Sequence, residues 1–427
     1  MRAVSFWLLV IGWSVGCGEK AAEGDTGALG LSTSVSTTSP SATSSSTATA
    51  TTGTSTPSTT STTGSTGSTA TSSTVWPSLP DMDAVLAGEM AAADVPGAQA
   101  AILKGGEVVW VGNYGVRHLD EGTPVTDDTS FSLASISKTV TVVALMQAVE
   151  QGYLTLDDPV DDLVGFTVRH PVSSDPILVR HLLTHTSGIR DNWDIMDASY
   201  TVGDPTEPLG DFLERYLDPD GVSYDAGRNF QDWAPGARYS YSNIGAALAG
   251  YLVEATTGVD FAQWCRDEIF EPLGMAHTGW YLADLEDELI AHPHVCYGSC
   301  SPISHYGYPD YPDGMLRSTT HDMGRFMSMM FHNGSLDGVR IVTEDSVGEM
   351  LTVTLPSYGQ ALVWYSTEIG GEPYFGHDGG DVGVATEMFF RRSDGLGYAL
   401  WMNGDPRGWT HVMNVTRALL ETGQAKF

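Results

Sequence analysis

The residues of this chain best suited to nucleophilic chemistry are Ser135 and Lys138, the ends of its one Ser-x-x-Lys tetrad. Lys138 is one of only four lysines in the 427 residues. The tetrad opens the run SISKTVTVVALMQAVEQG, whose apolar character predicts a buried helix that stops near Gly152. Side chains three positions apart share a helix face, so we expect the Lys138 amine beside the Ser135 hydroxyl, close to the free N–H groups of the first helical turn.

This placement favours an activated serine. A cation buried at the positive end of a helix is costly, which pushes the Lys138 amine toward the neutral form that accepts a proton from a hydroxyl. The tetrad alone is equally compatible with a helix-capping serine followed by a surface lysine, because short motifs match by chance. Other motifs in the chain must decide between these two interpretations.

A second motif, Tyr241-Ser-Asn243, precedes the helical run IGAALAGYLVEATTG and is the one Tyr-x-Asn of the chain. A phenol has an ordinary pKa of about 10, so Tyr241 becomes a useful base only beside a positive charge such as Lys138. Asn243 offers one donor and one acceptor for positioning an amide or an ester. By itself the motif predicts only a hydrogen-bonded loop tyrosine.

A third motif, Gly376-His377-Asp378-Gly379-Gly380, ends a predicted strand. Its glycines permit a substrate to approach the backbone closely. The N–H of Gly380 is therefore a candidate partner for the N–H of Ser135 in an oxyanion hole. Alone, a glycine-rich turn would indicate only a hairpin.

Strand-like segments gather at the two ends of the folded part. Residues 98–103 and 107–113 form a predicted hairpin across Gly105-Gly106, and short apolar runs cover 361–368, 373–377, 384–391 and 397–402. Helical patterns cover 82–93 and 410–422. The fold class is therefore α+β: an antiparallel sheet built from both ends of the domain, flanked by helices, with an inserted mainly helical lobe. Ser135 is expected where the sheet and the lobe meet.

The N-terminal residues predict export rather than fold. Residues 1–16 resemble a signal peptide, with an apolar run at 4–15 and Cys17 as the lipidated residue after cleavage. Lipoprotein signals usually carry leucine where this chain has Ser14, so ordinary secretion remains an alternative. Residues 17–75 form a Ser/Thr-rich tether, uncharged from 32 to 74, with a reach of roughly 35–40 Å. Residues 76–427 form the folded domain.

The chain is strongly acidic, with 53 acidic against 20 basic residues and a formal charge of −33. Nucleic acids and bare anionic lipid surfaces are consequently poor partners. Contact with a membrane is expected through the lipid anchor only, which places the protein in the bacterial cell envelope.

Of the remaining cysteines, Cys265 lies in an amphipathic stretch and is expected as a buried free thiol. Cys296 and Cys300 are expected to form a short-loop disulfide, as is natural in an exported protein. The nearby His292 and His294 allow a rival metal-site interpretation, but their spacing fits no common zinc pattern.

With these motifs in order, the chain resembles the class C β-lactamase superfamily, which includes D-Ala-D-Ala carboxypeptidases, D-aminopeptidases and serine esterases. The resemblance rests on SLASISKTVTVVALMQAVEQGYLTLDDPV, HLLTHTSGI, YSYSNIG, FEPLGMAHT, GMLRSTTHDMGRF and GHDGG. It implies Ser135 as nucleophile, Lys138 and Tyr241 as the proton-transfer pair, and Asn243 as substrate positioner. It further implies that 377–379 form the third motif on the sheet edge, that His185 is structural, and that no metal or organic cofactor is needed.

The third motif departs from the family pattern. Where relatives carry Lys-Thr-Gly or His-Thr-Gly, this chain has Asp378 in the middle position. The family's threonine helps to hold a substrate carboxylate, whereas an aspartate would repel it by about 1–3 kcal/mol at close range. We therefore expect an ester, or an amide with a neutral or cationic group at that position, as the substrate. The alternatives are a β-lactamase, a D-Ala-D-Ala carboxypeptidase or a D-aminopeptidase acting on cell-wall peptides, and a non-catalytic envelope-binding protein.

Overall fold

The computed structural model describes residues 75–296, 298–406 and 408–427. The predicted signal segment, Cys17 and the tether up to residue 74 lie outside these ranges. Among the described helices, none combines the length and the apolar character needed to cross a membrane.

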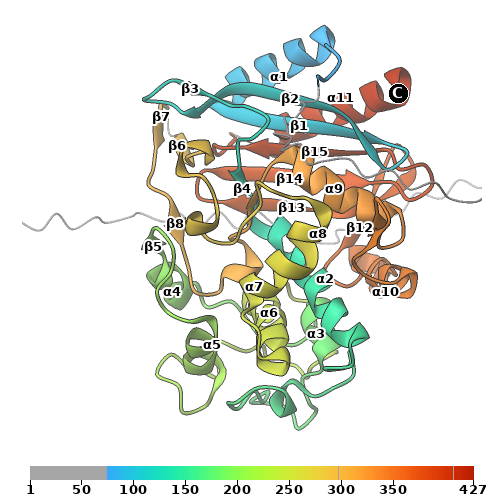
Figure 1. The fold of residues 1–427 in the computed structure, drawn as a ribbon. Coiled ribbons are helices and arrows are strands. Elements are labelled where there is room, and N and C mark those ends of the chain that lie inside the picture. Colours follow the sequence, from blue (N-terminus) through green and yellow to red (C-terminus); the bar gives the residue numbers. More distant parts are fainter. Residues whose placement is uncertain (1–74, 297, 407) are drawn as a thin grey trace, which may run out of the picture. The chain divides into compact units, whose positions relative to one another are not determined.

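A seven-stranded antiparallel sheet organises the domain (Figure 1), in the order β12-β13-β14-β15-β1-β2-β3. The strands of this sheet are β1 (Gly97–Lys104), β2 (Glu107–His118), β3 (Thr123–Pro124), β12 (Tyr365–Ile369), β13 (Glu372–Asp381), β14 (Val384–Phe390) and β15 (Gly397–Met402). Its first and last strands in the chain, β1 and β15, pair directly. The sheet is therefore built from both ends of the domain, as predicted.

The long excursion between β3 and β12 is mainly helical and contains four short strand pairs. Those pairs are β4 (Phe131–Ser132) with β9 (Arg317–Ser318), β5 (Thr201–Val202) with β8 (Tyr306–Gly307), β6 (His294–Cys296) with β7 (Cys300–Pro302), and β10 (Ser335–Leu336) with β11 (Val339–Arg340). The α-helices of the domain are α1 (Pro80–Ala93), α2 (Ser137–Glu150), α3 (Val179–Leu183), α4 (Trp193–Met196), α5 (Leu209–Leu217), α6 (Asn243–Thr257), α7 (Phe261–Cys265), α8 (Glu271–Leu273), α9 (Thr320–Phe331), α10 (Glu344–Met350) and α11 (Trp409–Lys426). Two short 3₁₀ turns matter for the site, η1 (Ala134–Ile136) and η7 (Tyr311–Asp313).

Two apolar cores sandwich the sheet. Helices α1 and α11 pack together over one face (Figure 1), where Leu86 and Leu419 are fully buried against that face of the strands. The opposite face packs against α9 and continues into the core of the helical lobe, which includes Phe326 and Trp364. Alternate residues of each strand therefore belong to different cores, as the period of a strand requires.

The sheet's turns follow from the sequence, with one exception. Gly105 and Gly106 both take positive φ, 63° and 81°, as a two-residue hairpin turn needs, and the predicted hairpin is confirmed. The predicted strand at 361–368 starts late, because Trp364 N bonds to Leu362 O (2.7 Å) and Val363 N bonds to Leu183 O (2.7 Å). That apolar run is buried as a turn against the lobe, and only its last part joins the sheet.

Helix α2 is the buried centre of the lobe. Every residue from Ser137 to Ala148 is buried, so the helix has no solvent-facing side. It packs against α6 and ends before Gly152, whose φ of 79° is left-handed, as predicted. Burial on all sides fixes the helix, and with it the position of the tetrad at its N-terminal end.

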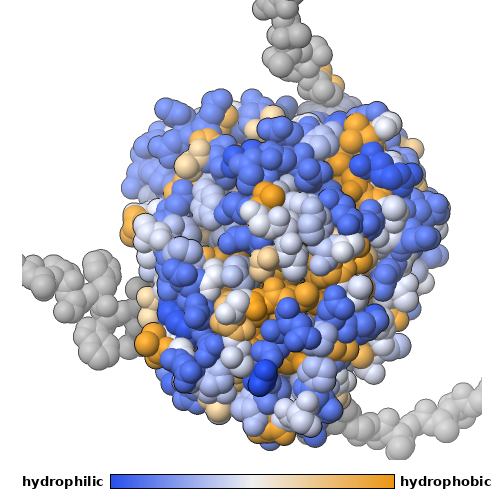
Figure 2. All heavy atoms as spheres, turned by 60° about the horizontal axis from the view of Figure 1, so that its bottom comes forward, coloured by the Kyte–Doolittle hydropathy of each residue, from blue (hydrophilic) through white to orange (hydrophobic). Residues whose placement is uncertain are grey.

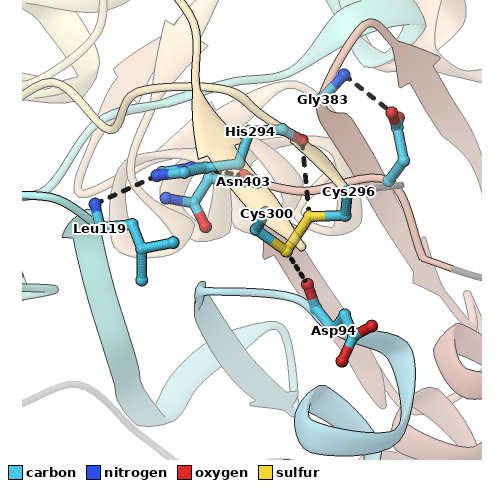
Figure 3. Close-up of a disulfide and its surroundings, with 8 residues drawn as sticks. Asp94, Leu119, His294, Cys296, Cys300, Gly383 and Asn403 are labelled. Carbon is cyan, nitrogen blue, oxygen red and sulfur yellow. Dashed lines mark hydrogen bonds between the residues drawn. A yellow bond between two sulfur atoms is a disulfide. The ribbon is translucent and has the colours of Figure 1, made fainter. Parts of the chain in front are cut away.

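The sulfur atoms of Cys296 and Cys300 are bonded to each other across the β6–β7 pair (Figure 3). His294 Nδ1 bonds to the carbonyl oxygen of Asn403 (2.9 Å), and its Nε2 accepts the N–H of Leu119 (3.1 Å). Both ring nitrogens of His294 and both sulfurs are thus engaged within the protein, which disfavours the rival metal site. Cys265 is a buried free thiol, as expected.

The face of the domain in Figure 2 is mostly hydrophilic, with hydrophobic residues gathered in an irregular band across its middle and in a patch at the upper right. Hydrophilic cover of this kind fits a chain with 53 acidic residues. An apolar band among polar residues commonly accompanies a binding surface.

Candidate active site

Ser135 and Lys138 meet at the entry to α2. Lys138 Nζ donates a hydrogen bond to Ser135 Oγ over 3.0 Å. Lys138 is fully buried, whereas Ser135 is partly exposed between buried neighbours. The predicted contact between the two side chains is present. Of the two groups, the Ser135 hydroxyl is the one that a substrate can reach.

A strained turn presents the serine. Ala134, which directly precedes it, has a φ of 48°, in the left-handed region that non-glycine residues rarely adopt. A methyl group added at Gly379 would lie 2.4 Å from the carbonyl oxygen of Leu133 and 3.1 Å from Ser135 N. The turn therefore lies against β13 so closely that only glycine fits at 379. The Thr386 hydroxyl donates to Leu133 O (2.8 Å) and ties the turn to the sheet.

Lys138 is held from the side opposite Ser135. Its Nζ donates to the carbonyl oxygen of Asp313 over 2.6 Å and stands 5.0 Å from the centre of the Tyr241 ring. The amine is thereby fixed between the serine and the tyrosine by backbone that comes from η7. A cation in this position stabilises a phenolate on the neighbouring ring.

Tyr241 lies on the extended segment that enters α6. The next residue, Ser242, caps the helix by accepting the N–H of Gly245 (2.9 Å). His185 packs its ring 4.3 Å from that of Tyr241 and accepts the N–H of Ser242 on Nδ1 (3.3 Å). Burial lowers the pKa of His185 well below its usual value, so its ring is neutral. His185 supports the tyrosine without touching Ser135 in any contact described here, in agreement with its expected structural role.

Asn243 is the first residue of α6 and is anchored by Asp191. The Asp191 carboxylate accepts from Asn243 Nδ2 (2.9 Å) and from the backbone N–H groups of Asn243 (2.9 Å) and Ile244 (3.2 Å). Burial raises the pKa of Asp191, and these donors act in the opposite direction. A carboxylate at a helix N-terminus is favourably placed, and here it fixes the Asn243 amide that the sequence predicted as substrate positioner.

His377 brings the third motif to the same place. Its buried ring lies 6.3 Å from that of Tyr241 and 5.4 Å from that of Tyr365, measured between ring centres. Its Nδ1 bonds to the carbonyl oxygen of Asp378 (2.5 Å). Burial lowers the pKa of His377, as does the charge of Lys138, while the neighbouring Asp378 acts in the opposite direction. A neutral imidazole therefore faces the tyrosine.

The edge of β13 near Ser135 is open. β12 begins at Tyr365, opposite Gly376, so residues 377–381 have a strand on one side only. Asp381 pairs with Val384 across a two-residue turn, which directs its carbonyl toward β14. Backbone N–H and C=O groups of successive residues point to alternate sides of a strand, so the N–H of Gly380 points to the open edge. A Cβ atom added at Gly380 would meet no atom within 4 Å. This is the geometry that the predicted oxyanion donor requires.

Asp378 follows His377 on β13, and its carboxylate lies at the strand edge, 4.0 Å from Nδ1 of His377. It stands opposite Glu387 on β14, and Glu387 interacts with Tyr398 and Thr416 on the face covered by α11. Burial raises the pKa of Glu387 to about 8, and the charge of Asp378 adds to this. The Asp378 carboxylate accepts from Tyr365 Oη (2.7 Å), and its side chain remains 27% exposed at the strand edge. Strand alternation gives His377 and Asp378 opposite faces of β13, and the Asp378 carboxylate reaches the strand edge beside the imidazole.

A tyrosine cluster forms the wall beyond the oxyanion strand. The rings of Tyr200 and Tyr308 lie tilted against each other with centres 4.7 Å apart, and both hydroxyls donate to the Asp381 carboxylate (3.2 and 3.3 Å). The Tyr308 hydroxyl occupies the space beside Gly314, where an added methyl group would lie only 2.2 Å from it. The tyrosine-rich segment 305–313, for which the sequence left open a wall or a surface loop, is thus packed beside the site.

Several of these residues escaped the sequence analysis. These residues belong to no short sequence motif and come to the site from separate segments of the chain. They are Asp191, Asp313 through its carbonyl, Tyr200, Asp381 and Thr386. Asp191 follows the THTSGI segment closely, and that proximity was the one available signal.

The arrangement combines a reachable hydroxyl, a buried amine, a phenol and the N–H of Gly380 at an open strand edge. Such a set can form and hydrolyse an acyl-serine. The described residues contain no cluster of three or more His, Cys, Asp or Glu side chains arranged to hold a metal ion.

The comparisons with known proteins agree with this geometry. The family model described as "Beta-lactamase" matches residues 82–422. "Penicillin-binding protein 4" of Amycolatopsis lactamdurans is 29% identical over 328 residues, 73% of this chain and 81% of that protein. "Esterase EstB" of Burkholderia gladioli is 30% identical over 217 residues, 48% of this chain and 52% of that protein.

Solved structures establish the fold. "A class C beta-lactamase" superposes with a TM-score of 0.64 at 19% identity, covering 80% of this chain and 95% of that one. "D-alanine Carboxypeptidase AmpC from Burkholderia cenocepacia" gives a TM-score of 0.60 at 22% identity, covering 80% and 99%. The fold is thus β-lactamase/transpeptidase-like, as predicted. The chain belongs to the beta-lactamase family, within the superfamily of serine hydrolases that also contains penicillin-binding proteins and esterases.

Proposed function

We propose that the protein hydrolyses a carboxylic ester or amide through an acyl-enzyme on Ser135, with small esters as the preferred substrates. The observation that carries this proposal is the hydrogen bond of 3.0 Å between the buried Lys138 amine and the reachable Ser135 hydroxyl, 5.0 Å from the Tyr241 ring. A buried lysine is expensive to maintain, so one aimed at a serine hydroxyl favours a catalytic role over a non-catalytic binding protein.

In the proposed reaction, Ser135 Oγ attacks the substrate carbonyl while its proton passes to the Lys138–Tyr241 pair. The N–H groups of Ser135 and Gly380 hold the oxyanion. The leaving alcohol or amine departs with that proton, and Ser135 retains the acyl group as an ester. Water then adds to this ester, and the Ser135 oxygen recovers a proton as the carboxylic acid leaves. Asn243, fixed by Asp191, orients the substrate. Every step uses protein groups and water.

The preference for an ester rests on charge. Asp378 and Asp381 stand on opposite faces of β13 and bracket the Gly379–Gly380 segment along which the substrate would lie. A substrate carboxylate bound there would meet two acidic groups, which costs free energy, whereas an uncharged ester would not. The relative named as an esterase supports the same reaction.

The penicillin-binding relative, matched over 81% of its length, supports a second candidate, hydrolysis of a β-lactam or of a D-Ala-terminated peptide. A screen of p-nitrophenyl esters, D-amino-acid amides and nitrocefin, each with the wild-type protein and Ser135→Ala, separates the candidates. We expect the highest serine-dependent kcat/KM on a short-chain ester. A higher value on nitrocefin would replace the esterase proposal, and no serine-dependent turnover on any of the three classes would support a binding protein.

The Asp378→Thr variant tests the charge argument. We expect kcat/KM for a cephalosporin, relative to that for a neutral ester, to rise about 10-fold, because the change removes a like charge at the strand edge. The Asp378 carboxylate lies at the strand edge and is 27% exposed to solvent, which screens its charge, so we expect the lower end of the range for a direct contact.

Two further variants interpret that result. Asp378→Asn keeps the shape and should give a similar rise if charge is the cause. Glu372→Thr removes the same charge from the exposed far end of β13 and should leave the ratio unchanged. A ratio that stays constant in both Asp378 variants would refute the charge argument and give the β-lactam candidate equal standing.

We also propose that the protein is exported and anchored by a lipid on Cys17. Cys17→Ser is then expected to move the protein from the membrane fraction to the soluble fraction, because the acidic domain has no affinity for anionic lipid. Fractionation after a high-salt wash is the measurement, with wild type as the reference. A variant that still sediments with membranes would contradict the lipid anchor.

A further inference from the structure

Two buried aspartates without an assigned role lie behind Lys138. Asp310 precedes the turn η7 and Asp313 ends it, and their side chains are 1% and 4% exposed. The main-chain oxygen of Asp313 is the acceptor that fixes Lys138 Nζ at 2.6 Å. The same turn therefore carries both the backbone that holds the lysine and two carboxyl groups.

These carboxyl groups have few donors. Outside the pair itself, both oxygens of Asp310 and Oδ2 of Asp313 lack a donor from any other residue of the described chain, and the N–H of Asp310 itself is the one group that acts on its carboxyl as a backbone donor. The side chains of Asp310 and Asp313 do reach each other. Two ionised carboxylates side by side in a dry interior are too costly to coexist, so such a pair retains one proton between its members. Burial raises the pKa of Asp310 to about 7 and raises that of Asp313 as well, with repulsion by Asp310 as the next cause.

The other titratable groups that act on Lys138 come from three further elements. They include His185 after α3, Asp191 and Tyr241 at the entry to α6, and His377 on β13. Both histidines are neutral, because burial lowers the pKa of each. The Asp191 charge is already engaged by the N-terminus of α6. Asp381 on β13 also acts on Asp313, and its carboxylate accepts from Tyr200 and Tyr308. Among these carboxyl groups, the Asp310–Asp313 pair has the fewest donors from other residues.

We propose that Asp310 and Asp313 share one proton and that the single negative charge they retain keeps Lys138 as an ammonium ion beside Tyr241. This inference rests on the proposed function, since it assigns a charge state within the same proton-transfer pair. Burial alone favours a neutral amine, and the aspartate pair opposes that tendency. Asp310 and Asp313 are positioning residues, because they act through Lys138.

The charge state of Lys138 can be measured directly, since the chain has four lysines and Lys138 is the fully buried one among those described. The experiment is an NMR pH titration of the full chain labelled with ¹³Cε-lysine, in which the Lys138 signal is assigned by its loss in Lys138→Met. Asp313→Asn and Asp310→Asn each leave one carboxylate in place. The wild-type pair with its shared proton also carries one negative charge, so neither single variant should change the pH midpoint of the Lys138 titration. The double variant removes the charge and should lower the midpoint by at least about one pH unit.

The outcomes separate cleanly. A midpoint that moves in each single variant would mean that both groups are ionised, and a midpoint unmoved in the double variant would mean that the pair carries no charge; either result overturns the proposal. Asp322→Asn, a neutralisation at another buried site, is the matched control and should leave the midpoint unchanged.

In the double variant, the alkaline limb of the pH profile of kcat/KM should shift to lower pH together with the Lys138 midpoint. A merely structural defect would instead lower kcat/KM at every pH. If the midpoint moves but Ser135→Ala keeps its activity, the pair acts as inferred and the proposed function is the part that fails.

Discussion

Replacing Ser135 by alanine is expected to reduce ester hydrolysis to the background rate, because it removes the one oxygen that forms the acyl-enzyme. The fold should survive. Ser135 is partly exposed, and its side chain makes one described hydrogen bond, the one from Lys138. Losing a bond of this kind costs about 1 kcal/mol, well within the stability of a domain. Steady-state hydrolysis of a p-nitrophenyl ester, together with thermal unfolding of the variant, is the measurement.

Ser132→Ala provides the matched control for this variant. Ser132 lies three residues earlier, on β4, and is likewise partly exposed. Its removal should leave hydrolysis within twofold of wild type. Ser135→Ala activity within about tenfold of wild type, in a folded protein, would place the nucleophile elsewhere.

Lys138→Met and Tyr241→Phe are each expected to lower the acylation rate at least about 100-fold, because both interrupt the same proton transfer from Ser135. Methionine is preferred to alanine at 138, since Lys138 is fully buried and truncation would leave a cavity. The measurement is the single-turnover acylation rate of each variant and of the double variant.

The double variant Lys138→Met/Tyr241→Phe tests whether the two residues act in the same step. Residues that act as a unit have non-additive effects, so it should be little slower than the slower single variant. Rate losses that multiply in full would contradict a shared role in proton transfer. Thermal unfolding of all three variants separates a loss of chemistry from a loss of fold.

The sequence predicted the fold and the core of the site because their signals are local. A helix that is apolar on all sides, α2, has to be buried, and its start fixes the spacing of Ser135 and Lys138. The Gly105-Gly106 turn needs positive φ at both positions, which identifies the hairpin without knowledge of the rest of the sheet. The family resemblance then placed Tyr241 and His377 in one site, where the structure has them.

The contacts that the sequence did not predict depend on tertiary packing. The hydrogen bond between Asp191 and Asn243 links residues 52 positions apart, and the ring contact between Tyr200 and Tyr308 links two separate segments. The side to which Asp378 points depends on how β13 registers with β14, and one step along the strand reverses it. The motif alone therefore could not fix the direction of the Asp378 side chain.

The central claim is that Ser135 forms a covalent acyl-type intermediate, and the most direct test is to trap it. The full chain is treated with a fluorophosphonate probe and digested, and the labelled residue is identified by mass spectrometry, with Ser135→Ala treated in parallel. We expect one adduct per chain, on the peptide that contains Ser135, and none in the variant. A wild-type protein that stays unlabelled while it hydrolyses an ester, or an adduct on another residue, would contradict the account.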